Sequence, residues 1–304
     1  MKIKDIGETG LIERISRGIC LDRSVVRGVG DDAAVIKWTS EKYLLYTCDM
    51  LIEGVHFRRK EATPFQIGWK ALGRNISDIA AMGGLPRYAV VSAAIDPELP
   101  VSFAQGLYEG IRALASKFGV NLVGGDTCRS KRLVMDVSLI GEVERKNLVT
   151  RNGARPGDLI MVTGTIGGAH KFKHLRFLPR VAEARTLVKK FKISSMIDIS
   201  DGLAIDLWRV LQASGVGARI SQDLIPVSRD ASSFERAISD GEDFELLFTM
   251  RPSEARRLFA LASAGLMRTP LTLIGEIMPE KYGYTLITRS GRIKKLDKKG
   301  YLHF

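Results

Sequence analysis

The chain has 304 residues, 45% of them hydrophobic, and its 46 Lys and Arg outnumber 34 Asp and Glu for a formal net charge of +12. This length allows about two domains of ordinary size. No apolar run approaches the roughly 20 residues that span a bilayer, and the N-terminus lacks the apolar core of a signal peptide, so we expect a cytoplasmic protein without a membrane segment.

Cysteine spacing and charge distribution disfavour two further classes of protein. Cys20, Cys48 and Cys128 show no CxxC spacing, so neither a disulfide framework nor a zinc site is indicated. The cations occur in short scattered groups, without interleaved aromatic residues of the kind that stack on bases. We therefore favour a solvated, charge-rich surface, and a basic nucleic-acid-binding protein remains the non-enzyme alternative.

In the first half of the chain, β-branched and apolar residues between turn signals predict strands at 43–48, 87–95, 120–123 and 133–143. Two helices separate these strands. The first follows Thr63–Pro64, a suitable N-cap and first helical position, and runs to Met82, where two glycines end it. The second is predicted from about Ser102 to Phe118, before Gly119.

A polar, turn-rich break at 144–158 predicts a domain boundary, which divides the chain into residues 1–145 and 146–304. After it we predict strands and helices in alternation, at 159–163, near 167–191, at 202–214 and 218–221, and then at 244–250, 251–264 and 271–277. Because this alternation lacks a strict βαβ rhythm, it favours an α+β fold over a doubly wound parallel sheet.

The usual nucleotide-binding and catalytic fingerprints are missing from the sequence. There is no GxxxxGK[ST] loop, no protein-kinase motif set, no HExxH and no GxSxG. Five segments stand out instead, each with aspartate in a turn of small residues beside an apolar strand: GVGDDAAVI (28–36), YTCDM (46–50), NISDIAAMGG (75–84), LVGGDT (122–127) and IDISDG (197–202).

Aspartates beside apolar strands indicate a site for cations, because Asp is rarely buried unless it is paired or bound to a metal. Oxygen ligands favour Mg²⁺ over Zn²⁺, and many carboxylates imply several ions and hence a polyphosphate. For a single residue such as Asp78, a local hydrogen bond or solvent exposure explains the position equally well. The candidates are Asp31, Asp32, Asp49, Asp78, Asp126, Asp198 and Asp201. They would repel one another without metal, so we expect the metal-free protein to be loosened there.

In their order along nearly the whole chain, these segments resemble the thiamine-monophosphate kinases, a family of the aminoimidazole-ribonucleotide-synthetase-like superfamily of ATP-using enzymes. Further matching pieces are CDMLIEGVHF (48–57), LVTRNGARPGD (148–158), GEDFELLFT (241–249) and GYLHF (300–304). The resemblance implies a two-domain α+β fold. Its N-terminal mixed sheet would pair across a homodimer into a β-barrel, with ATP near this contact, and its C-terminal domain would be an α/β sandwich.

The resemblance also implies roles for individual residues. Several Mg²⁺ ions on the ATP phosphates would be held, with Asp32 as a helper, by Asp31, Thr47, Asp49, Asp78, Asp126, Asp198 and Asp201. Nucleotide contacts are implied, besides Asp126, for Tyr108, Gly125, Arg151 and Ser200. The pocket for thiamine phosphate would contain His56, Glu242 and Tyr301. From the residues alone, a structural role is the more frequent one for a histidine such as His56, and packing is an alternative for Tyr301.

Two residues depart from the family pattern. Cys48 stands where a hydroxyl residue usually precedes the strand-end aspartate, so either its backbone carbonyl serves a metal ion or one ion is held differently. Asp240 replaces a typical glycine, which adds negative charge and reduces backbone freedom beside the acceptor pocket.

The implied reaction converts ATP and thiamine phosphate to ADP and thiamine diphosphate by direct in-line transfer. A phosphate nucleophile is already ionised, so a general base is dispensable, and catalysis would rest on Mg²⁺, Asp49, Asp126 and Arg151. The alternative enzyme is another member of the superfamily, such as aminoimidazole-ribonucleotide synthetase, selenophosphate synthetase or a hydrogenase-maturation enzyme.

Overall fold

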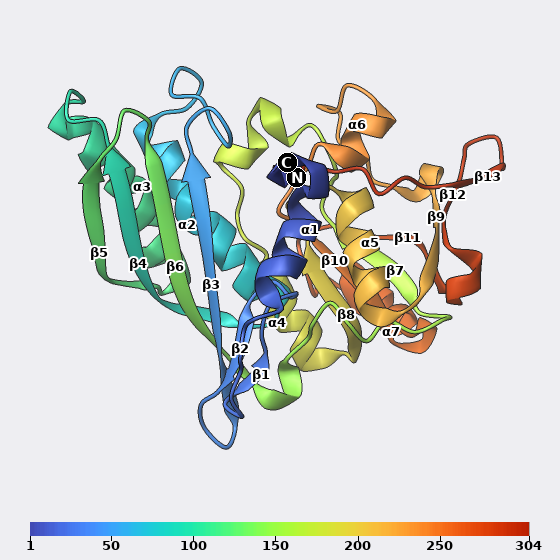
Figure 1. Cartoon of the computed structure of the whole chain (residues 1–304). Helices are drawn as coiled ribbons and strands as arrows, with labels where there is room; N and C mark the ends of the chain where they lie inside the picture. The colour runs from blue at the N-terminus through green and yellow to red at the C-terminus, as the bar shows by residue number, and fades with distance from the viewer. Residues whose placement is uncertain (304) are drawn as a thin grey trace.

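The computed structural model describes residues 1–303, and the strands of this range form two mixed sheets, one from each half of the chain (Figure 1). The first sheet has six strands in the order β1-β2-β3-β6-β4-β5. Its only parallel pair among the described residues is β4 with β5. The strands are β1 (Val25–Arg27), β2 (Ala34–Lys37), β3 (Lys42–Ile52), β4 (Leu85–Ile95), β5 (Asn121–Arg129) and β6 (Val134–Glu144).

Two long helices cover the inner face of this sheet, and both were predicted from the sequence. Helix α2 (Pro64–Ala81) begins with a capping box, in which the Gln66 backbone N–H donates to Thr63 Oγ1 at 3.2 Å and the Thr63 N–H donates to Gln66 Oε1 at 2.9 Å. Helix α3 (Val101–Phe118) ends at Gly119 in the left-handed conformation, φ 67°. The predicted helices are confirmed to within about a residue.

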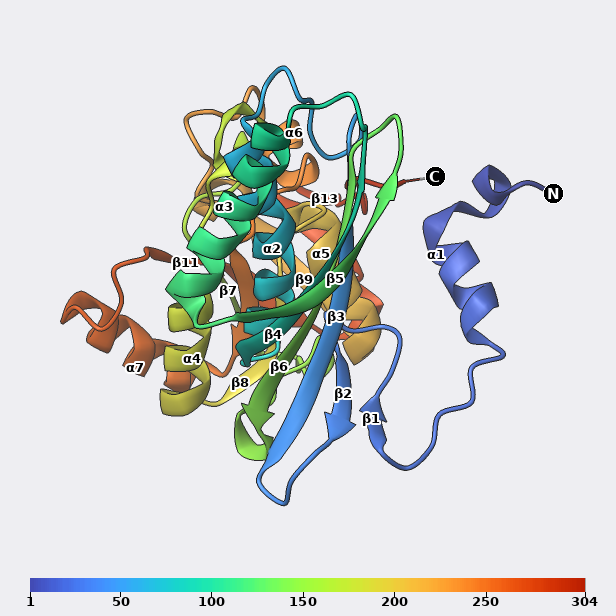
Figure 2. The same ribbon diagram turned by 90° about the vertical axis from the view of Figure 1, so that its left-hand side faces the viewer.

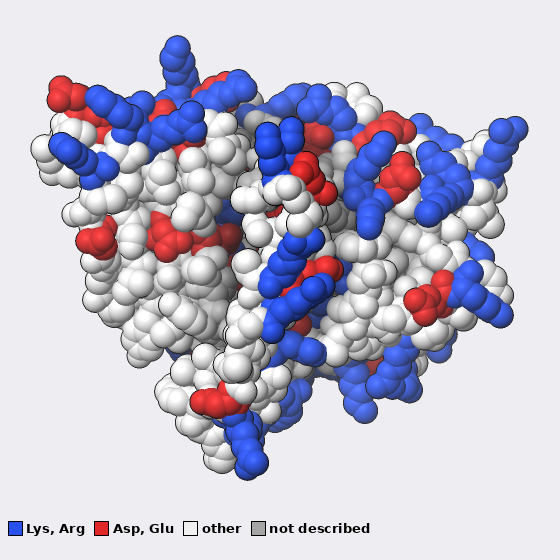
Figure 3. Space-filling model, viewed as in Figure 1, with Lys and Arg blue, Asp and Glu red and all other residues white. Residues whose placement is uncertain are grey.

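The outer face of the N-terminal sheet is exposed and apolar. Along β3, buried Leu45 and Leu51 alternate with exposed Tyr46 and Met50, as expected for a strand with one buried face. No helix among residues 1–303 covers this outer side (Figure 2). In the space-filling view the surface over these strands is largely free of charged groups, with a few carboxylates across its middle (Figure 3).

The second sheet has seven strands in the order β13-β12-β9-β11-β7-β10-β8 within the described range. Its strands are β7 (Leu159–Thr163), β8 (Ile193–Asp198), β9 (Gly217–Ser221), β10 (Leu246–Met250), β11 (Leu271–Met278), β12 (Tyr284–Ile287) and β13 (Ile293–Lys295). Four helices accompany it, namely α4 (Val181–Lys190), α5 (Leu203–Ser214), α6 (Phe234–Ser239) and α7 (Pro252–Ser263). Side chains pack on both faces, since Val162 of β7 belongs to the cluster around α5 and Met161 to the cluster around α4 and α7.

Helix α2 lies between the two halves of the molecule. The larger core cluster joins its Ile76 and Ile79 to Met135 and Val137 of the N-terminal sheet and also to Phe248 of the C-terminal sheet. Side chains of α2 that do not enter this core can therefore reach groups from both halves. Because α2 lies between the two sheets, its charged residues can contact aspartates of the second half of the chain.

The first helix, α1 (Ile3–Ser16), has no buried residue and lies beside the body of the molecule (Figure 2). The two chain ends meet there, because the His303 backbone N–H donates to Glu8 Oε2 at 3.1 Å. None of the helices in residues 1–303 is long and apolar enough to cross a membrane.

The fold confirms the mixed α and β content but corrects one predicted helix. The segment near 167–191 is helical only over α4, and before it the chain makes two short 3-10 turns, Ala169–Lys171 and Lys173–Leu175. Gly167 and Gly168 both have positive φ, 86° and 72°, which a continuous α-helix cannot accommodate.

Candidate active site

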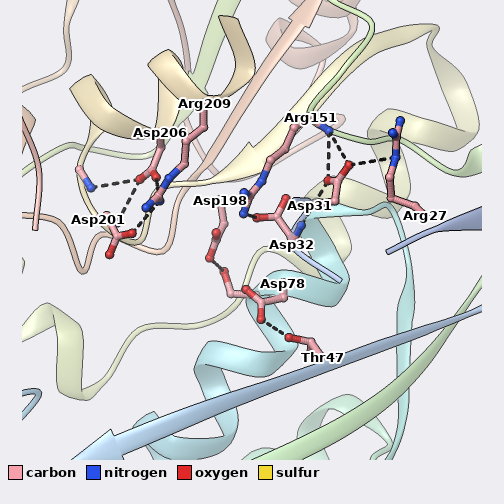
Figure 4. A network of polar contacts seen from close by, with 12 residues as sticks. Arg27, Asp31, Asp32, Thr47, Asp78, Arg151, Asp198, Asp201, Asp206 and Arg209 are labelled. Atoms are coloured by element: carbon pink, nitrogen blue, oxygen red, sulfur yellow. Dashed lines mark hydrogen bonds and ion pairs between the residues drawn. The ribbon is translucent and has the colours of Figure 1, made fainter. Parts of the chain in front are cut away.

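Three carboxylates from distant parts of the sequence meet between the two sheets. Asp32 precedes β2, Asp78 lies in the last turn of α2, and Asp198 ends β8. One oxygen from each can be chosen so that all three lie within 4.8 Å of one another, a spacing that suits a shared metal ion (Figure 4). We call Asp32, Asp78 and Asp198 the acid cluster.

A hydrogen-bond donor orients each member of the acid cluster. Thr47 Oγ1 donates to Asp78 Oδ2 at 2.6 Å, and Ser77 Oγ donates to Asp198 Oδ2 at 2.6 Å. Arg151 Nη2 donates to Asp32 Oδ1, also at 2.6 Å. Thr47 can reach α2 because alternation along β3 directs it to the buried face. Two strands, a helix and two loops therefore position this cluster.

The electrostatics of the acid cluster favour the binding of a cation. Burial raises the pKa of Asp78 well above its ordinary value, and the charges of Asp49, Asp198 and Asp32 raise it further. Burial and Asp32 also raise the pKa of Asp198, although the hydrogen bond from Ser77 opposes this effect. Carboxylates crowded in a buried site favour the neutral form unless a cation is bound.

Asp32 supplies independent evidence that a ligand belongs at this position. Asp32 is only 8% exposed, and within residues 1–303 its buried Oδ2 atom has no hydrogen-bond partner. A buried carboxylate oxygen without a partner is costly and is best explained by an ion or ligand. Since the three carboxylates offer hard oxygen atoms as metal ligands, the cluster fits Mg²⁺.

Two more predicted aspartates border the cluster and are held by arginines (Figure 4). Asp31 accepts from the Arg151 backbone N–H at 3.1 Å, and burial together with the Asp32 charge raises its pKa to about 6. Asp201 lies 2.6 Å from Arg209 Nη1, which also contacts Asp206 at 2.7 Å. Burial and Asp201 raise the pKa of Asp206 to about 7.

A cavity of about 750 Å³ lies beside the carboxylates. The three residues predicted for the acceptor, His56, Glu242 and Tyr301, all line it, and so do Ser200 and Asp201. The cavity wall also contains cations and aromatic groups that the sequence had not indicated, among them Arg74, His170, Phe172, His174 and His303.

Glu242 is held at the cavity by a buried lysine. Lys70 of α2 has no exposed surface, forms an ion pair with Glu242, and donates to the His56 carbonyl at 2.7 Å. Its Nζ also lies 2.9 Å from His174 Nδ1. Burial alone would raise the pKa of Glu242, but Lys70, His174 and Arg74 outweigh burial and hold it below the ordinary range. Glu242 is therefore ionised.

The loop that carries Glu242 has an unusual backbone. Glu242 and Phe244 adopt positive φ values of 62° and 50°, a conformation that costs energy for residues other than glycine. The Glu242 backbone N–H donates to the Ser200 carbonyl at 2.7 Å, so this loop is tied to the turn after β8. Strained positions of this kind gather at ligand sites.

His56 is a neutral group in this structure. The Ile52 backbone N–H donates to His56 Nδ1 at 3.0 Å, which makes Nδ1 an acceptor and places the ring proton on Nε2. Burial, helped by the charge of Arg74, lowers the pKa of His56 to about 3. A neutral ring suits recognition of a ligand more than proton transfer.

The single chain does not bring every predicted residue to the acid cluster. Asp126 and Gly125 lie on the exposed edge strand β5, where Asp126 pairs with Ser92 of β4. Tyr108 of α3 packs against the large core. The Cys48 side chain points to the outer face of β3, opposite Thr47, so its thiol is not a ligand of the cluster in this chain.

The two departures from the family pattern have structural explanations. Asp240 is the C-cap residue after α6 and has φ −75°, an ordinary helical value, so this position does not require glycine. Its carboxylate pairs with Arg236 at 3.0 Å, which offsets the added negative charge. Cys48 lies on the exposed outer face, where a hydroxyl group would not reach the cluster either.

Sequence reasoning missed Lys70, Arg74, His174 and Asp206. The four-residue spacing of Lys70, Arg74 and Asp78 along a helix with apolar neighbours was a usable signal, because it places three charges on one face. For Asp206 the signal was weaker, since acidic residues are common in the first turn of a helix. For His174 there was none, because its partners come from α2 and the loop after α6.

The arrangement combines a cluster that can hold cations with an adjoining cavity for an organic ligand. It offers several carboxylate ligands for metal ions and three partly buried arginines, Arg74, Arg151 and Arg209. Such a site suits the transfer of a phosphoryl group between two phosphate-bearing ligands, a reaction in which positioning and charge neutralisation matter most.

Comparison with known proteins gives a consistent result. Residues 30–143 match the AIR synthase related protein N-terminal domain, and residues 155–287 match the corresponding C-terminal domain. The chain is 36% identical over 296 residues to the thiamine-monophosphate kinase of Rhodopirellula baltica, with 92% of each chain covered. It is 33% identical over 333 residues to that of Aquifex aeolicus, with both chains fully covered.

A solved structure has the same fold throughout. AaThiL complexed with AMPPCP and TMP superposes with a TM-score of 0.85 at 31% sequence identity, covering 100% of this chain and 99% of the other.

Proposed function

We propose a reaction and mechanism that proceed from one premise, namely that this chain belongs to the AIR synthase related proteins and, among them, to the thiamine-monophosphate kinase family. The reaction is transfer of the γ-phosphoryl group of ATP to thiamine monophosphate, which yields ADP and thiamine diphosphate. The observation that carries the proposal is the acid cluster of Asp32, Asp78 and Asp198, with Arg74, one helical turn before Asp78, in the wall of a cavity of about 750 Å³.

The transfer needs no covalent enzyme intermediate. An oxygen of the acceptor's phosphate attacks the γ-phosphorus, and the bond from that phosphorus to the β–γ bridging oxygen breaks, leaving its electron pair on ADP. A phosphate monoester with a second pKa near 6 is largely ionised at neutral pH, so no base has to remove a proton. The neutral His56 is consistent with this mechanism.

Asp32, Asp78 and Asp198 would hold Mg²⁺. Thr47, which donates to Asp78, and Asp31, Asp49 and Asp201 would serve as further oxygen ligands. When bound, Mg²⁺ supplies positive charge that offsets the negative charge on the transferred phosphoryl group. Arg151, now paired with Asp32, would turn to the nucleotide phosphates once a metal ion occupies that carboxylate. Ser200, at the cavity, would contact the same ligand.

We further propose that the protein acts as a homodimer through the outer face of the N-terminal sheet. That face exposes 47% of Tyr46, 50% of Met50 and 50% of Tyr88, and neighbouring exposed apolar side chains of this kind mark protein interaction sites. Asp126, Gly125 and Cys48 lie on or beside this face. A second copy would enclose them and bring Asp126 to the nucleotide.

Domain 1–145 would supply the dimer contact and most metal ligands, and domain 146–304 would supply Asp198, Asp201 and the loop with Glu242. Cytoplasmic location and absence of nucleic-acid binding remain predictions from the sequence.

One assay tests the proposed function. Purified protein is incubated with ATP and Mg²⁺ and with thiamine monophosphate, free thiamine or formylglycinamidine ribonucleotide, and ADP and phosphorylated products are quantified. We expect thiamine diphosphate and ADP in equal amounts, only with the first acceptor and only while Mg²⁺ is present. Turnover of the ribonucleotide instead would identify another reaction of the superfamily, and ATP-independent, salt-dependent binding to arbitrary DNA without turnover would favour the non-enzyme alternative.

A further inference from the structure

Three charged residues of α2 form a row from the cavity to the acid cluster. Lys70, Arg74 and Asp78 are spaced by four residues, so they lie on one face of the helix at steps of about 6 Å along its axis. Lys70 contacts Glu242 at the cavity, and Asp78 belongs to the acid cluster. Arg74 therefore lies between the place of the acceptor and the place of the metal-bound phosphates.

The contacts of Arg74 fit this intermediate position. Its Nη2 atom lies 3.1 Å from Asp49 Oδ1, and its Nη1 donates to the Met50 carbonyl at 3.2 Å. The side chain is 15% exposed and lines the cavity. A guanidinium has five N–H donors in a planar fork, so these two contacts leave donors for a phosphate.

Arg74 is also surrounded by carboxylates from several elements. Burial lowers its pKa, but Asp49, Glu242, Asp78 and Asp201 together outweigh burial and raise it above the ordinary value. A phosphate that enters this region adds negative charge to an already acidic site. Binding it requires a cation on the acceptor side, in addition to any metal ions on the nucleotide side.

We propose that Arg74 binds the phosphate of the acceptor and holds its attacking oxygen toward the γ-phosphorus. This inference rests on the proposed kinase function. Asp49 is the partner of Arg74 in this structure. If Asp49 held a metal ion, the guanidinium of Arg74 would be available to the phosphate. During transfer the new bond joins the acceptor oxygen to the γ-phosphorus, the bond to the bridging oxygen breaks, and Arg74 keeps its proton.

The competing explanation is that Arg74 is only a counter-ion that neutralises Asp49. The two roles predict different effects of its removal. A counter-ion alone would alter the affinity of Asp49 for metal and leave recognition of the acceptor's phosphate unchanged. A phosphate ligand would discriminate between thiamine monophosphate and thiamine, which share every group except the phosphate.

The test compares the full-length protein with Arg74→Gln and Arg74→Lys. Calorimetry measures binding of thiamine monophosphate and of thiamine, each with Mg²⁺ and a non-hydrolysable ATP analogue present, and steady-state assays give kcat and KM. We expect Arg74→Gln to weaken thiamine monophosphate binding by about 10- to 100-fold, the range for losing a charged hydrogen bond, and to change thiamine binding less than about twofold. Arg74→Lys should recover part of the loss, because it keeps the charge but not the fork.

Arg289→Gln is the matched control, since Arg289 is 78% exposed and pairs with Asp223 away from the cavity. It should behave as the wild type. Equal weakening of thiamine and thiamine monophosphate by Arg74→Gln, or unchanged binding of both with tighter Mg²⁺ binding, would overturn the proposal. A wild-type protein that never phosphorylates thiamine monophosphate would overturn the proposed function instead, so the two failures are distinguishable.

Discussion

At the scale of single residues, the site consists of carboxylates whose charge is only partly compensated by protein groups. Arginines partner Asp32, Asp49 and Asp201, but Asp78 and Asp198 accept from the hydroxyl groups of Thr47 and Ser77. Neutral donors compensate a buried charge less well than a cation does. The free protein therefore holds in the acid cluster an electrostatic cost that binding of metal and nucleotide would remove.

Replacement of Asp78 by Asn should stabilise the metal-free protein and abolish turnover. Asp78 has a folded-state pKa above its unfolded value, so its ionisation destabilises the fold as pH rises through that interval. In EDTA at pH 7.5, the free energy of unfolding should rise by on the order of 1–3 kcal/mol, and the difference from wild type should shrink as pH falls. Urea titrations at several pH values measure this.

Asp223→Asn is the control for this variant, because Asp223 is 60% exposed in its pair with Arg289. It should change stability by less than about 0.5 kcal/mol at every pH. A metal-free Asp78→Asn protein that is less stable than the wild type at pH 7.5 would contradict the electrostatic account of the acid cluster.

His56 should remain neutral across the working pH range. With a folded-state pKa of about 3, below its unfolded value, it binds a proton on unfolding and so reduces stability as pH falls below about 6.5. Nitrogen-detected NMR of the imidazole should show the Nε2–H tautomer and no titration between pH 5 and 8. A midpoint near 6.5 would show that the hydrogen bond from Ile52 does not hold the ring as described.

At the scale of elements, a buried ion network anchors the chain segment 164–180, which forms part of the cavity wall. Glu245, at 1% exposure, accepts from Lys173 at 2.8 Å and from Thr163 at 2.7 Å. Arg180 donates twice to the same carboxylate, both at 2.7 Å. His174 and Leu175 lie between these two cations in the chain and line the cavity, so the network fixes this part of the wall on both sides.

Replacement of Glu245 by Gln should destabilise the protein and loosen this wall. Two cations would lose their shared carboxylate, and breaking a buried ion pair on one side costs about 3–5 kcal/mol. Urea unfolding measures the loss, and hydrogen exchange should show faster exchange in residues 164–180. In the exposed pair of Arg58 with Glu61, Glu61→Gln should cost less than about 1 kcal/mol. Similar losses for the two variants would refute the anchoring role.

At the scale of the whole molecule, the exposed face of the N-terminal sheet predicts self-association. Val90→Lys places a charge on this face beside Tyr88. We expect the wild type to sediment as a dimer and this variant as a monomer near the chain mass of 33.5 kDa. Analytical ultracentrifugation decides this. Val101→Lys, at a site 75% exposed at the start of α3, is the control and should stay dimeric. A wild-type protein that sediments as a monomer would contradict the prediction.

The sequence by itself determined the type of fold and the two long helices of the first half, and it pointed to the aspartates from which the site is proposed. Helix α2 could be predicted because its cap at Thr63 and its end at Gly83 are local signals. The aspartates could be identified because charge beside an apolar strand is unfavourable without a partner. The family followed from the order of the motifs, and the matching domain models agree with it.

Only the tertiary structure decided which residues share the site. It joined Asp32, Asp78 and Asp198, placed Asp126 and Cys48 on an exposed strand face, and brought Arg74 and Lys70 to the cavity. The physical reason is that these contacts join residues far apart in the chain, through the packing of α2 between two sheets. Sequence spacing shows which side chains share a face of one element, but it does not show which faces meet.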